Sequence, residues 1–354
     1  MSTVRGARPR AGNRPPSTRP LSPHPRGTVV YEAIESRALA GNPLGDPSTR
    51  TLAVYLPPGY EQGRRRYPVV HVLSGFLGSG LSFLNWSFTG EPLDRRLDRL
   101  IGEGAMKPCI VALPDAITAL GGSQYLNSRG TGRYADYFAD EVVPRVDRSF
   151  RTLAEPAHRA VMGKSSGGYG ALVHAMRRPD LFGAVASHSG DMYFEYGYLP
   201  DLPKACTAIG QAGGLASWLA RYHAAKKKSH GLITTLNIVA MAACYSPGKA
   251  GAIELPFDLE TGKMRDKVWA RWLAHDPLRI LEERGSARAL ESMRLVYLDA
   301  GSRDEWNLHL GARMFAARAR ELGVRLTHEE FDDGHMDVSY RLDVSLPKVS
   351  RAIA

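Results

Sequence analysis

Residues 159–170 read RAVMGKSSGGYG and decide the fold, because here a tight glycine-rich turn joins an apolar run to a helical pattern. The run before Gly163 is typical of a buried strand, and Tyr169–Met176 has helical spacing. Gly163-Lys164-Ser165-Ser166-Gly167 matches GxSxG, a strand-to-helix turn that lifts the serine hydroxyl above a sheet. Glycines on both sides of Ser165 let neighbouring backbones approach closely. The stretch therefore predicts that Ser165 is a nucleophile at the start of a helix.

The letters Gly163-Lys164-Ser165 also occur in phosphate-binding loops, so a nucleotide site has to be considered. That motif requires a glycine five residues before Gly163, where this chain has His158. The sequence therefore excludes a phosphate-binding loop at this turn.

Outward from this turn, short apolar β-rich runs alternate with longer helical patterns. The predicted strands are Leu52–Leu56, Val69–Leu73, Cys109–Leu113, Arg159–Met162, Ala184–His188, Leu295–Leu298 and Leu326–Phe331. The predicted helices are Pro92–Ile101, Tyr134–Val146 with a kink at Pro144, Tyr169–Met176, Leu310–Leu322 and a terminal helix from about Val338. This alternation predicts an α/β fold with a mostly parallel central sheet and helices on both faces.

One long segment, Glu195–Met293, has no clear β-run and interrupts the alternation. It is far longer than a usual connection between strands. We interpret it as a helical insertion before the strand that bears the candidate acid, either a lid over the site or extra packing on one flank. Aromatic residues near its start could line an acyl pocket or form the core of the insertion: Tyr193, Phe194, Tyr196, Tyr198 and Trp218.

Residues 1–27 form a basic tail rich in proline and arginine, which we expect to be disordered because it has almost no large apolar residues. The predicted domain spans residues 28–354, with the insertion at about 195–293. The tail holds six arginines and no acid, so it accounts for much of the formal net charge of +10. Because the excess charge is concentrated in this tail, we expect no nucleic-acid partner. The tail lacks the apolar stretch of a secretory signal, and no run of about 18 apolar residues is present to span a membrane.

The three cysteines, Cys109, Cys206 and Cys244, are widely spaced and include no CxxC pair. This odd count argues against both a disulfide framework and a zinc site. We therefore expect a cytoplasmic protein without a metal or an organic cofactor. The oligomeric state cannot be inferred from the sequence.

A nucleophilic serine needs a base within hydrogen-bond reach and an acid that orients the base. His335 is the candidate base, because it follows a late strand, precedes the last helix and completes the order serine, acid, histidine. Asp299, Asp304 and Glu305 are candidates for the acid, at the end of the strand Leu295–Leu298 or just after it. We favour Asp304, which lies beyond a turn and can swing toward the histidine, whereas Asp299 could hold the loop by hydrogen bonds.

The oxyanion that forms during serine attack needs two preorganised N–H donors. The first candidate is the backbone N–H of Ser166, the residue after the nucleophile. The second is the N–H of Phe76, in the glycine-rich loop 74–78 that follows the strand Val69–Leu73.

Several stretches resemble the Putative esterase family of α/β hydrolases, which includes S-formylglutathione hydrolase, enterochelin esterase, feruloyl esterases and the antigen 85 mycolyltransferases. The matching segments run in order over about residues 28–340: VYLPPGY (54–60), YPVV (67–70), LSGF (73–76), PD (114–115), DEVVP (140–144), the GxSxG turn, RPDLF (178–182), DAGSRD (299–304) and GH (334–335). The resemblance implies the α/β-hydrolase fold, with Ser165 as nucleophile, Asp304 as acid, His335 as base, and Phe76 with Ser166 as oxyanion donors. Ser74 departs from the family, whose members commonly have a histidine before the oxyanion glycine.

The resemblance implies a serine hydrolase that cleaves a small-molecule carboxylic ester through an acyl-enzyme on Ser165. Two other interpretations stay open. An acyltransferase would use the same triad with an alcohol other than water as acceptor. A non-catalytic binding or scaffold protein would keep the fold alone.

Overall fold

The computed structural model describes residues 23–354, so most of the tail predicted to be disordered, residues 1–22 of 1–27, lies outside the described residues. Eight strands form one sheet in the order β1-β2-β4-β3-β9-β10-β11-β12. They are β1 (Thr28–Glu35), β2 (Thr49–Leu56), β3 (Val69–Leu73), β4 (Ile110–Pro114), β9 (Arg159–Lys164), β10 (Ala184–His188), β11 (Leu295–Gly301) and β12 (Thr327–Phe331). The β1–β2 and β2–β4 pairs are antiparallel and the remaining pairs are parallel, which confirms the predicted architecture.

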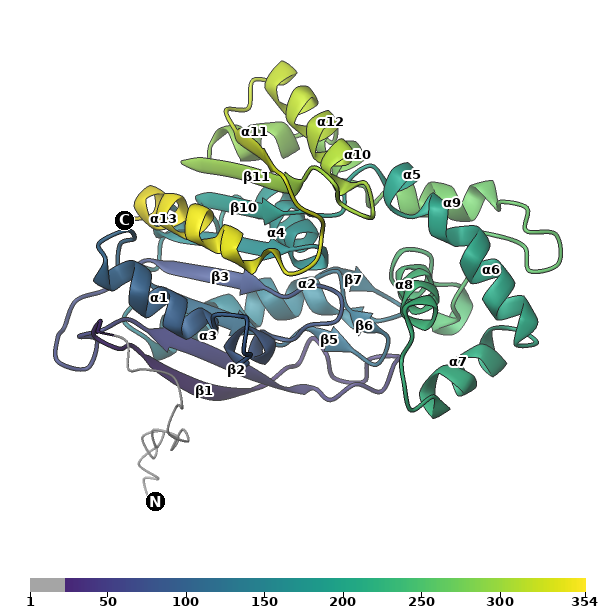
Figure 1. Ribbon diagram of the computed structural model, residues 1–354, viewed down its shortest axis with the longest axis horizontal. Helices are drawn as coiled ribbons and strands as arrows, with labels where there is room; N and C mark the ends of the chain where they lie inside the picture. The colour runs from purple at the N-terminus through teal and green to yellow at the C-terminus, as the bar shows by residue number, and fades with distance from the viewer. Residues whose placement is uncertain (1–22) are drawn as a thin grey trace.

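Helices cover both faces of this sheet (Figure 1). Val70 and Val72 of β3 pack in a core that includes residues of α1 (Leu93–Gly102) and α13 (Leu342–Ala352). Val69 and Leu73 of the same strand belong to the core on the opposite face, with α4 (Ser166–Arg177). Because successive side chains of a strand point to opposite faces, this two-sided burial explains why the β3 sequence is apolar without alternation.

The helix predicted over Tyr134–Val146 is irregular in the stretch that leads to its proline. The chain forms α2 (Tyr134–Asp136), a π-helical segment, η2 (Tyr137–Val142), and α3 (Val143–Ser149). Val142 and Val143 both have right-handed helical dihedral angles, so Pro144 follows the π-helical segment within one continuous helical run. A proline there has no N–H, and its ring crowds the carbonyl four residues earlier, which disrupts the regular hydrogen bonds of the preceding turn. The irregularity predicted at Pro144 is therefore present as the π-helical segment directly before it.

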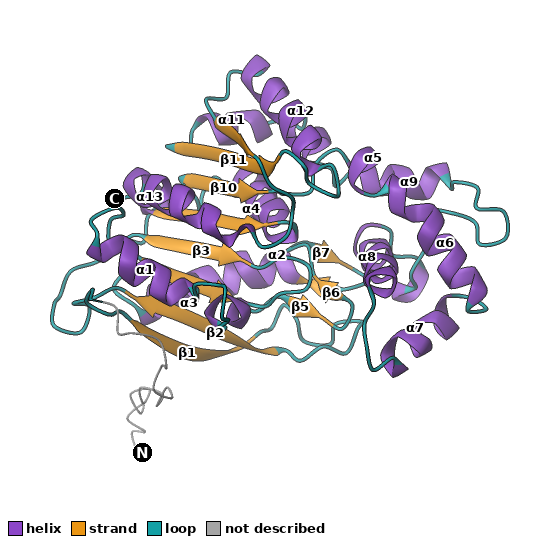
Figure 2. Cartoon of the chain, viewed as in Figure 1, coloured by secondary structure: helices purple, strands orange, loops and turns teal. Residues whose placement is uncertain are grey.

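The segment between β10 and β11 is helical; most of it gathers beyond one end of the sheet (Figure 2), and its last two helices pack against α4. Its helices are α5 (Phe194–Gly197), α6 (Leu202–Gln211), α7 (Leu215–Ala224), α8 (His230–Tyr245), α9 (Asp266–Leu273), α10 (Pro277–Leu281) and α11 (Ser286–Glu291). The helix α12 (Leu308–Glu321) follows β11. Two short hairpins, β5 (Ile117–Thr118) with β6 (Gly121–Gly122) and β7 (Asn127–Ser128) with β8 (Gly132–Arg133), lie beside α8.

Buried aromatic rings pack the insertion against α4, the helix that follows Ser165. Phe194 stacks on Tyr245 at a centroid distance of 5.3 Å, and Tyr245 meets Trp272 at 5.6 Å. Tyr169 of α4 lies 6.1 Å from Phe194, and its hydroxyl donates a hydrogen bond of 2.9 Å to the His275 carbonyl. These rings form the core of the insertion rather than the wall of an open pocket.

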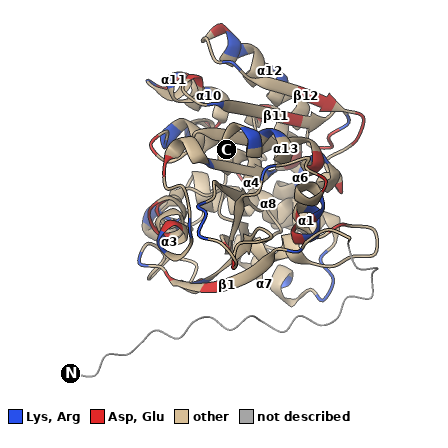
Figure 3. Cartoon of the chain, turned by 90° about the vertical axis from the view of Figure 1, so that its left-hand side faces the viewer, with Lys and Arg blue, Asp and Glu red and all other residues tan. Residues whose placement is uncertain are grey.

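Acidic and basic residues alternate along the elements visible in Figure 3. Among residues 23–354, none of the helices is both long enough and apolar enough to cross a membrane.

Three buried histidines predict that the fold loses stability in mild acid. Burial lowers the pKa of His71 to about 3, and burial likewise lowers the pKa values of His174 and His275 to about 4. Below about pH 6.5 the unfolded chain binds protons at these sites and the folded chain does not. Each site therefore lowers the free energy of unfolding by about 1.4 kcal/mol for each pH unit below that value. The free energy of unfolding should therefore fall between pH 6.5 and about pH 5, which urea titrations at both values measure.

The His71→Leu variant is the matched control for this prediction. Within residues 23–354, neither ring nitrogen of His71 has a hydrogen-bond partner, and the ring packs edge-on against Phe138 and Phe182. Leucine keeps an apolar contact there but cannot bind a proton, so the acid-induced loss should shrink by about one third. Equal losses in the two proteins would contradict the assignment of the effect to His71.

Candidate active site

Ser165 lies at a strained turn between β9 and α4. Its backbone has φ 56° and ψ −126°, a conformation that costs energy for any residue with a side chain. Its N–H donates a hydrogen bond of 2.9 Å to the His188 carbonyl, and its carbonyl accepts one of 2.8 Å from Tyr169. The Ser165 side chain is half-buried at the N-terminus of α4. This is the geometry that the GxSxG pattern predicted.

The two glycines of the motif are required by close backbone contact. A Cβ atom on Gly167 would lie 2.1 Å from the Leu73 carbonyl oxygen at the end of β3. A Cβ atom on Gly163 would lie 2.5 Å from the Gly167 backbone. The turn can therefore sit between β3 and β10 only because neither position has a side chain.

Asp304 and His335 form a buried hydrogen-bonded pair. Asp304 Oδ2 lies 2.8 Å from His335 Nδ1, and the two residues are 3% and 5% exposed. A carboxylate can only accept a hydrogen bond, so Nδ1 carries the proton and Nε2 keeps its lone pair. The other oxygen of Asp304 accepts the Trp306 N–H at 2.9 Å, and the Trp306 ring lies edge-on to the imidazole at 4.8 Å. His335 is therefore held in the tautomer that a general base requires.

The other two acid candidates have different partners. Asp299 accepts hydrogen bonds from His188 at 2.6 Å and from Arg341 and Tyr297, each at 3.0 Å. Glu305 accepts the backbone N–H of His335 at 2.7 Å and so holds the loop rather than the ring. The structure thus brings Asp304, and not Asp299 or Glu305, to the imidazole of His335.

Ser165, Asp304 and His335 each follow the carboxyl end of a parallel strand, β9, β11 and β12 respectively, and so lie at one edge of the sheet. Lys164, just before the nucleophile, pairs with His188 of β10, and His188 pairs with Asp299 of β11. Burial lowers the pKa of Lys164, and the nearby charge of Asp304 offsets only part of this effect. Within the described residues no hydrogen bond joins the Ser165 hydroxyl to His335, and such bonds often tighten only when substrate binds.

The predicted oxyanion loop lies against the nucleophile. A Cβ atom on Gly75 would lie 3.5 Å from the Ser165 Cβ. The Ser74 hydroxyl forms a hydrogen bond of 3.1 Å with the Tyr125 hydroxyl. Tyr125 also donates to the Ser74 carbonyl at 3.0 Å, and Phe76 packs on Gly121. Tyr125 therefore fixes the orientation of this loop, and the N–H groups of Phe76 and Ser166 stay the predicted donors.

The family of the chain follows from a match that covers most of its length. Residues 47–341 match the family described as Putative esterase. The chain belongs to this esterase family. The esterase Rv1288 of Mycobacterium tuberculosis is 29% identical over 187 residues, which are 52% of this chain and 37% of that protein. An endo-1,4-beta-xylanase/feruloyl esterase of Xylanibacter ruminicola is 30% identical over 148 residues, 41% of this chain and 20% of that protein. This esterase thus spans well under half the length of both relatives.

Solved structures share the fold of this esterase at low sequence identity. A ferulic acid esterase superposes with a TM-score of 0.61 at 20% identity, covering 93% of this chain and 99% of the other. FphF, a fluorophosphonate-binding serine hydrolase of Staphylococcus aureus, gives 0.58 at 14% identity, with coverage of 93% and 99%. An S-formylglutathione hydrolase of Agrobacterium tumefaciens gives 0.52 at 16% identity, with coverage of 93% and 96%. These likenesses establish the α/β-hydrolase fold.

A buried polar cluster beside the site was missed by sequence reasoning. Asp191, just after β10, accepts hydrogen bonds from Gln124 at 2.9 Å and from the Tyr198 hydroxyl at 2.8 Å. Gln124 also donates to the Tyr245 hydroxyl at 2.9 Å, and it has a left-handed backbone with φ 54°. Burial raises the pKa of Asp191, and the charges of His335 and Asp304 act on it. The cluster joins the insertion to the edge of the sheet that holds the candidate site, and no local sequence signal marks it.

The site offers no evident metal ligands. Across residues 23–354, His, Cys, Asp and Glu side chains form no group of three or more that could hold a metal ion.

Proposed function

We propose that this esterase hydrolyses small-molecule carboxylic esters through an acyl-enzyme on Ser165. The observation that carries the proposal is the buried Asp304–His335 pair, whose protonated Nδ1 leaves Nε2 free to accept a proton. The strained backbone of Ser165 supports it, because such strain is expected where a turn must present a nucleophile. The half-buried serine and the buried pair lie at one edge of the sheet.

In the proposed reaction, His335 Nε2 takes the proton of Ser165 as its oxygen attacks the ester carbonyl. The N–H groups of Phe76 and Ser166 stabilise the oxyanion. His335 then gives the proton to the leaving alcohol, and a water molecule repeats the cycle on the acyl-enzyme. Asp304 keeps the imidazole in the correct tautomer and stabilises its charged form.

A reducing, cytoplasmic setting is part of the proposal. Cys109, Cys206 and Cys244 are free thiols, and two of them are buried. Burial raises the pKa values of Cys109 and Cys244 to about 12, which keeps both thiols protonated and unreactive.

Ester turnover by the purified full chain tests the proposed function. We expect hydrolysis of p-nitrophenyl acetate together with covalent labelling by a fluorophosphonate, which reports an activated serine. The panel should add p-nitrophenyl butyrate and octanoate, methyl ferulate and S-formylglutathione, because relatives carry the names feruloyl esterase and S-formylglutathione hydrolase. Labelling without turnover would indicate an acyltransferase that lacks its acceptor. A folded protein with neither labelling nor turnover would refute the hydrolase.

A further inference from the structure

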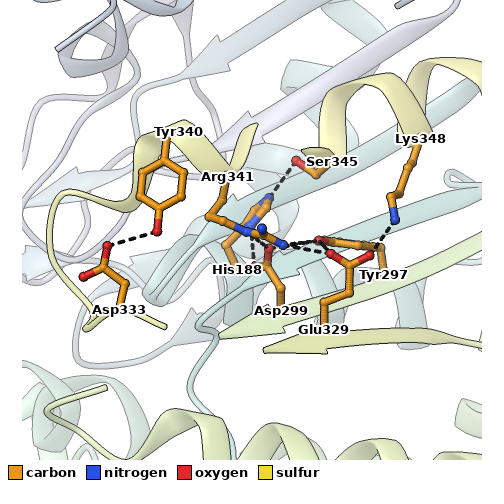
Figure 4. A network of polar contacts seen from close by, with 9 residues as sticks. All are labelled: His188, Tyr297, Asp299, Glu329, Asp333, Tyr340, Arg341, Ser345 and Lys348. Atoms are coloured by element: carbon orange, nitrogen blue, oxygen red, sulfur yellow. Dashed lines mark hydrogen bonds and ion pairs between the residues drawn. The ribbon is translucent and has the colours of Figure 1, made fainter. Parts of the chain in front are cut away.

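A second Ser–His–Asp arrangement lies on the α13 face of the sheet (Figure 4). His188 Nδ1 is 2.6 Å from Asp299 Oδ1, and His188 Nε2 is 2.9 Å from the Ser345 hydroxyl. His188 ends β10, Asp299 lies in β11 and Ser345 lies in α13. Relative exposures are 4% for His188, 1% for Asp299 and 0% for Ser345, so no ester can reach the Ser345 hydroxyl. This arrangement must act on something other than substrate.

Its contacts lead to each of the three predicted catalytic residues. The carbonyl of His188 accepts the Ser165 N–H at 2.9 Å, so the backbone of His188 supports the strained turn directly. The Asp299 carbonyl accepts the Ser189 N–H at 2.7 Å, which joins β10 to the strand that leads to Asp304. His188 therefore contacts the turn of the nucleophile through its backbone and the strand of the acid through its ring.

The third connection runs to the loop of His335. Arg341, six residues after His335, donates to Asp299 at 3.0 Å and to Glu329 of β12 at 2.8 Å. Tyr340 donates to Asp333, two residues before His335, at 2.9 Å. The loop that bears the base is thus tied to the same aspartate as His188 (Figure 4).

We propose that the His188–Asp299 pair is a positioning centre, which holds the segments that carry Ser165, Asp304 and His335 in the correct places relative to one another. The inference rests on the proposed function, since it assigns a role in that reaction. Burial opposes ionisation of Asp299, but His188 and Arg341 outweigh it and hold its pKa below the usual range. A buried ion pair is poor evidence for stability, because apolar residues of similar size often serve as well. Its directional bonds instead fix the relative placement of β10, β11 and α13.

Steady-state kinetics on the full chain tests this positioning role. His188→Leu removes both ring contacts, whereas His188→Asn keeps a donor that can reach Asp299. Arg351→Ala is the control, because Arg351 lies on the same helix but binds the Ala105 carbonyl, outside the network. Each protein is first titrated with a fluorophosphonate, so that kcat is expressed per reactive Ser165. The substrate is p-nitrophenyl acetate, and melting temperatures are recorded in parallel.

For His188→Leu we expect kcat per titrated site to fall about 10²-fold with KM unchanged, because a displacement of about 1 Å costs that much. His188→Asn should recover about tenfold of this loss, and Arg351→Ala should match wild type. If His188→Leu does not fold, Asp299→Asn takes its place, with a loss between about tenfold and 10²-fold expected.

A lower melting temperature with unchanged kcat per titrated site would overturn the positioning role and leave a purely structural pair. A loss in His188→Asn equal to that in His188→Leu would also overturn it, because the bond to Asp299 would then be irrelevant. Wild type that neither turns over nor labels would instead defeat the proposed function itself.

Discussion

Replacing Ser165 with alanine should lower kcat for p-nitrophenyl acetate by about 10⁶-fold and abolish labelling by a fluorophosphonate. The expected loss is this large because the covalent route ends when the nucleophile is removed, and what remains comes from binding and the oxyanion donors. The fold should be retained, since the serine side chain makes no hydrogen bond with the described residues and alanine is smaller. Kinetics, labelling and circular dichroism of the purified variant measure all three effects.

Ser217→Ala is the matched control, because Ser217 is an exposed serine of α7 in the insertion. It should retain both turnover and labelling at the wild-type level. If Ser165→Ala kept its labelling, another residue would be the reactive nucleophile, and the strained turn would need a different explanation.

The catalytic turn could be predicted because its chemistry is local. Gly163, Ser165 and Gly167 are close in sequence, and each contributes to one strand-to-helix turn, so a short pattern suffices. The buried strands could be predicted for the same reason, since an apolar run such as Val69–Leu73 reports its two-sided burial directly. The irregular helix could be placed at Pro144, because a proline inside a helical run disrupts its regular hydrogen bonds, but the π-helical form of the segment left no sequence signal.

Contacts between distant segments could not be predicted from the sequence. No local signal marks the role of His188, because its partners Asp299 and Ser345 lie 111 and 157 residues away. Asp191 and Gln124 were missed for the same reason, since their hydrogen bond spans 67 residues. The choice of Asp304 over Asp299 rested on its place beyond a turn and on the family resemblance, and only the fold shows that each carboxylate has its own histidine.

That division between the two aspartates predicts unequal effects of the same amide substitution. In Asp304→Asn, the remaining carbonyl oxygen is expected to keep the Trp306 N–H, now 2.9 Å from Oδ1, and the amide nitrogen then faces His335 Nδ1. Two donors cannot face one another, so the imidazole must move its proton to Nε2 and can no longer accept the serine proton. We expect kcat to fall about 10⁴-fold.

Asp299→Asn should cost between about tenfold and 10²-fold, because it weakens the support of the triad but leaves the tautomer of His335 intact. Each variant replaces one carboxylate oxygen of a buried aspartate by an amide nitrogen. Each is therefore the other's control for the loss of a buried negative charge. Parallel measurements of kcat per titrated serine provide the comparison. A larger loss in Asp299→Asn than in Asp304→Asn would reverse the assignment of the acid, because the residue that sets the tautomer of the base must have the larger effect.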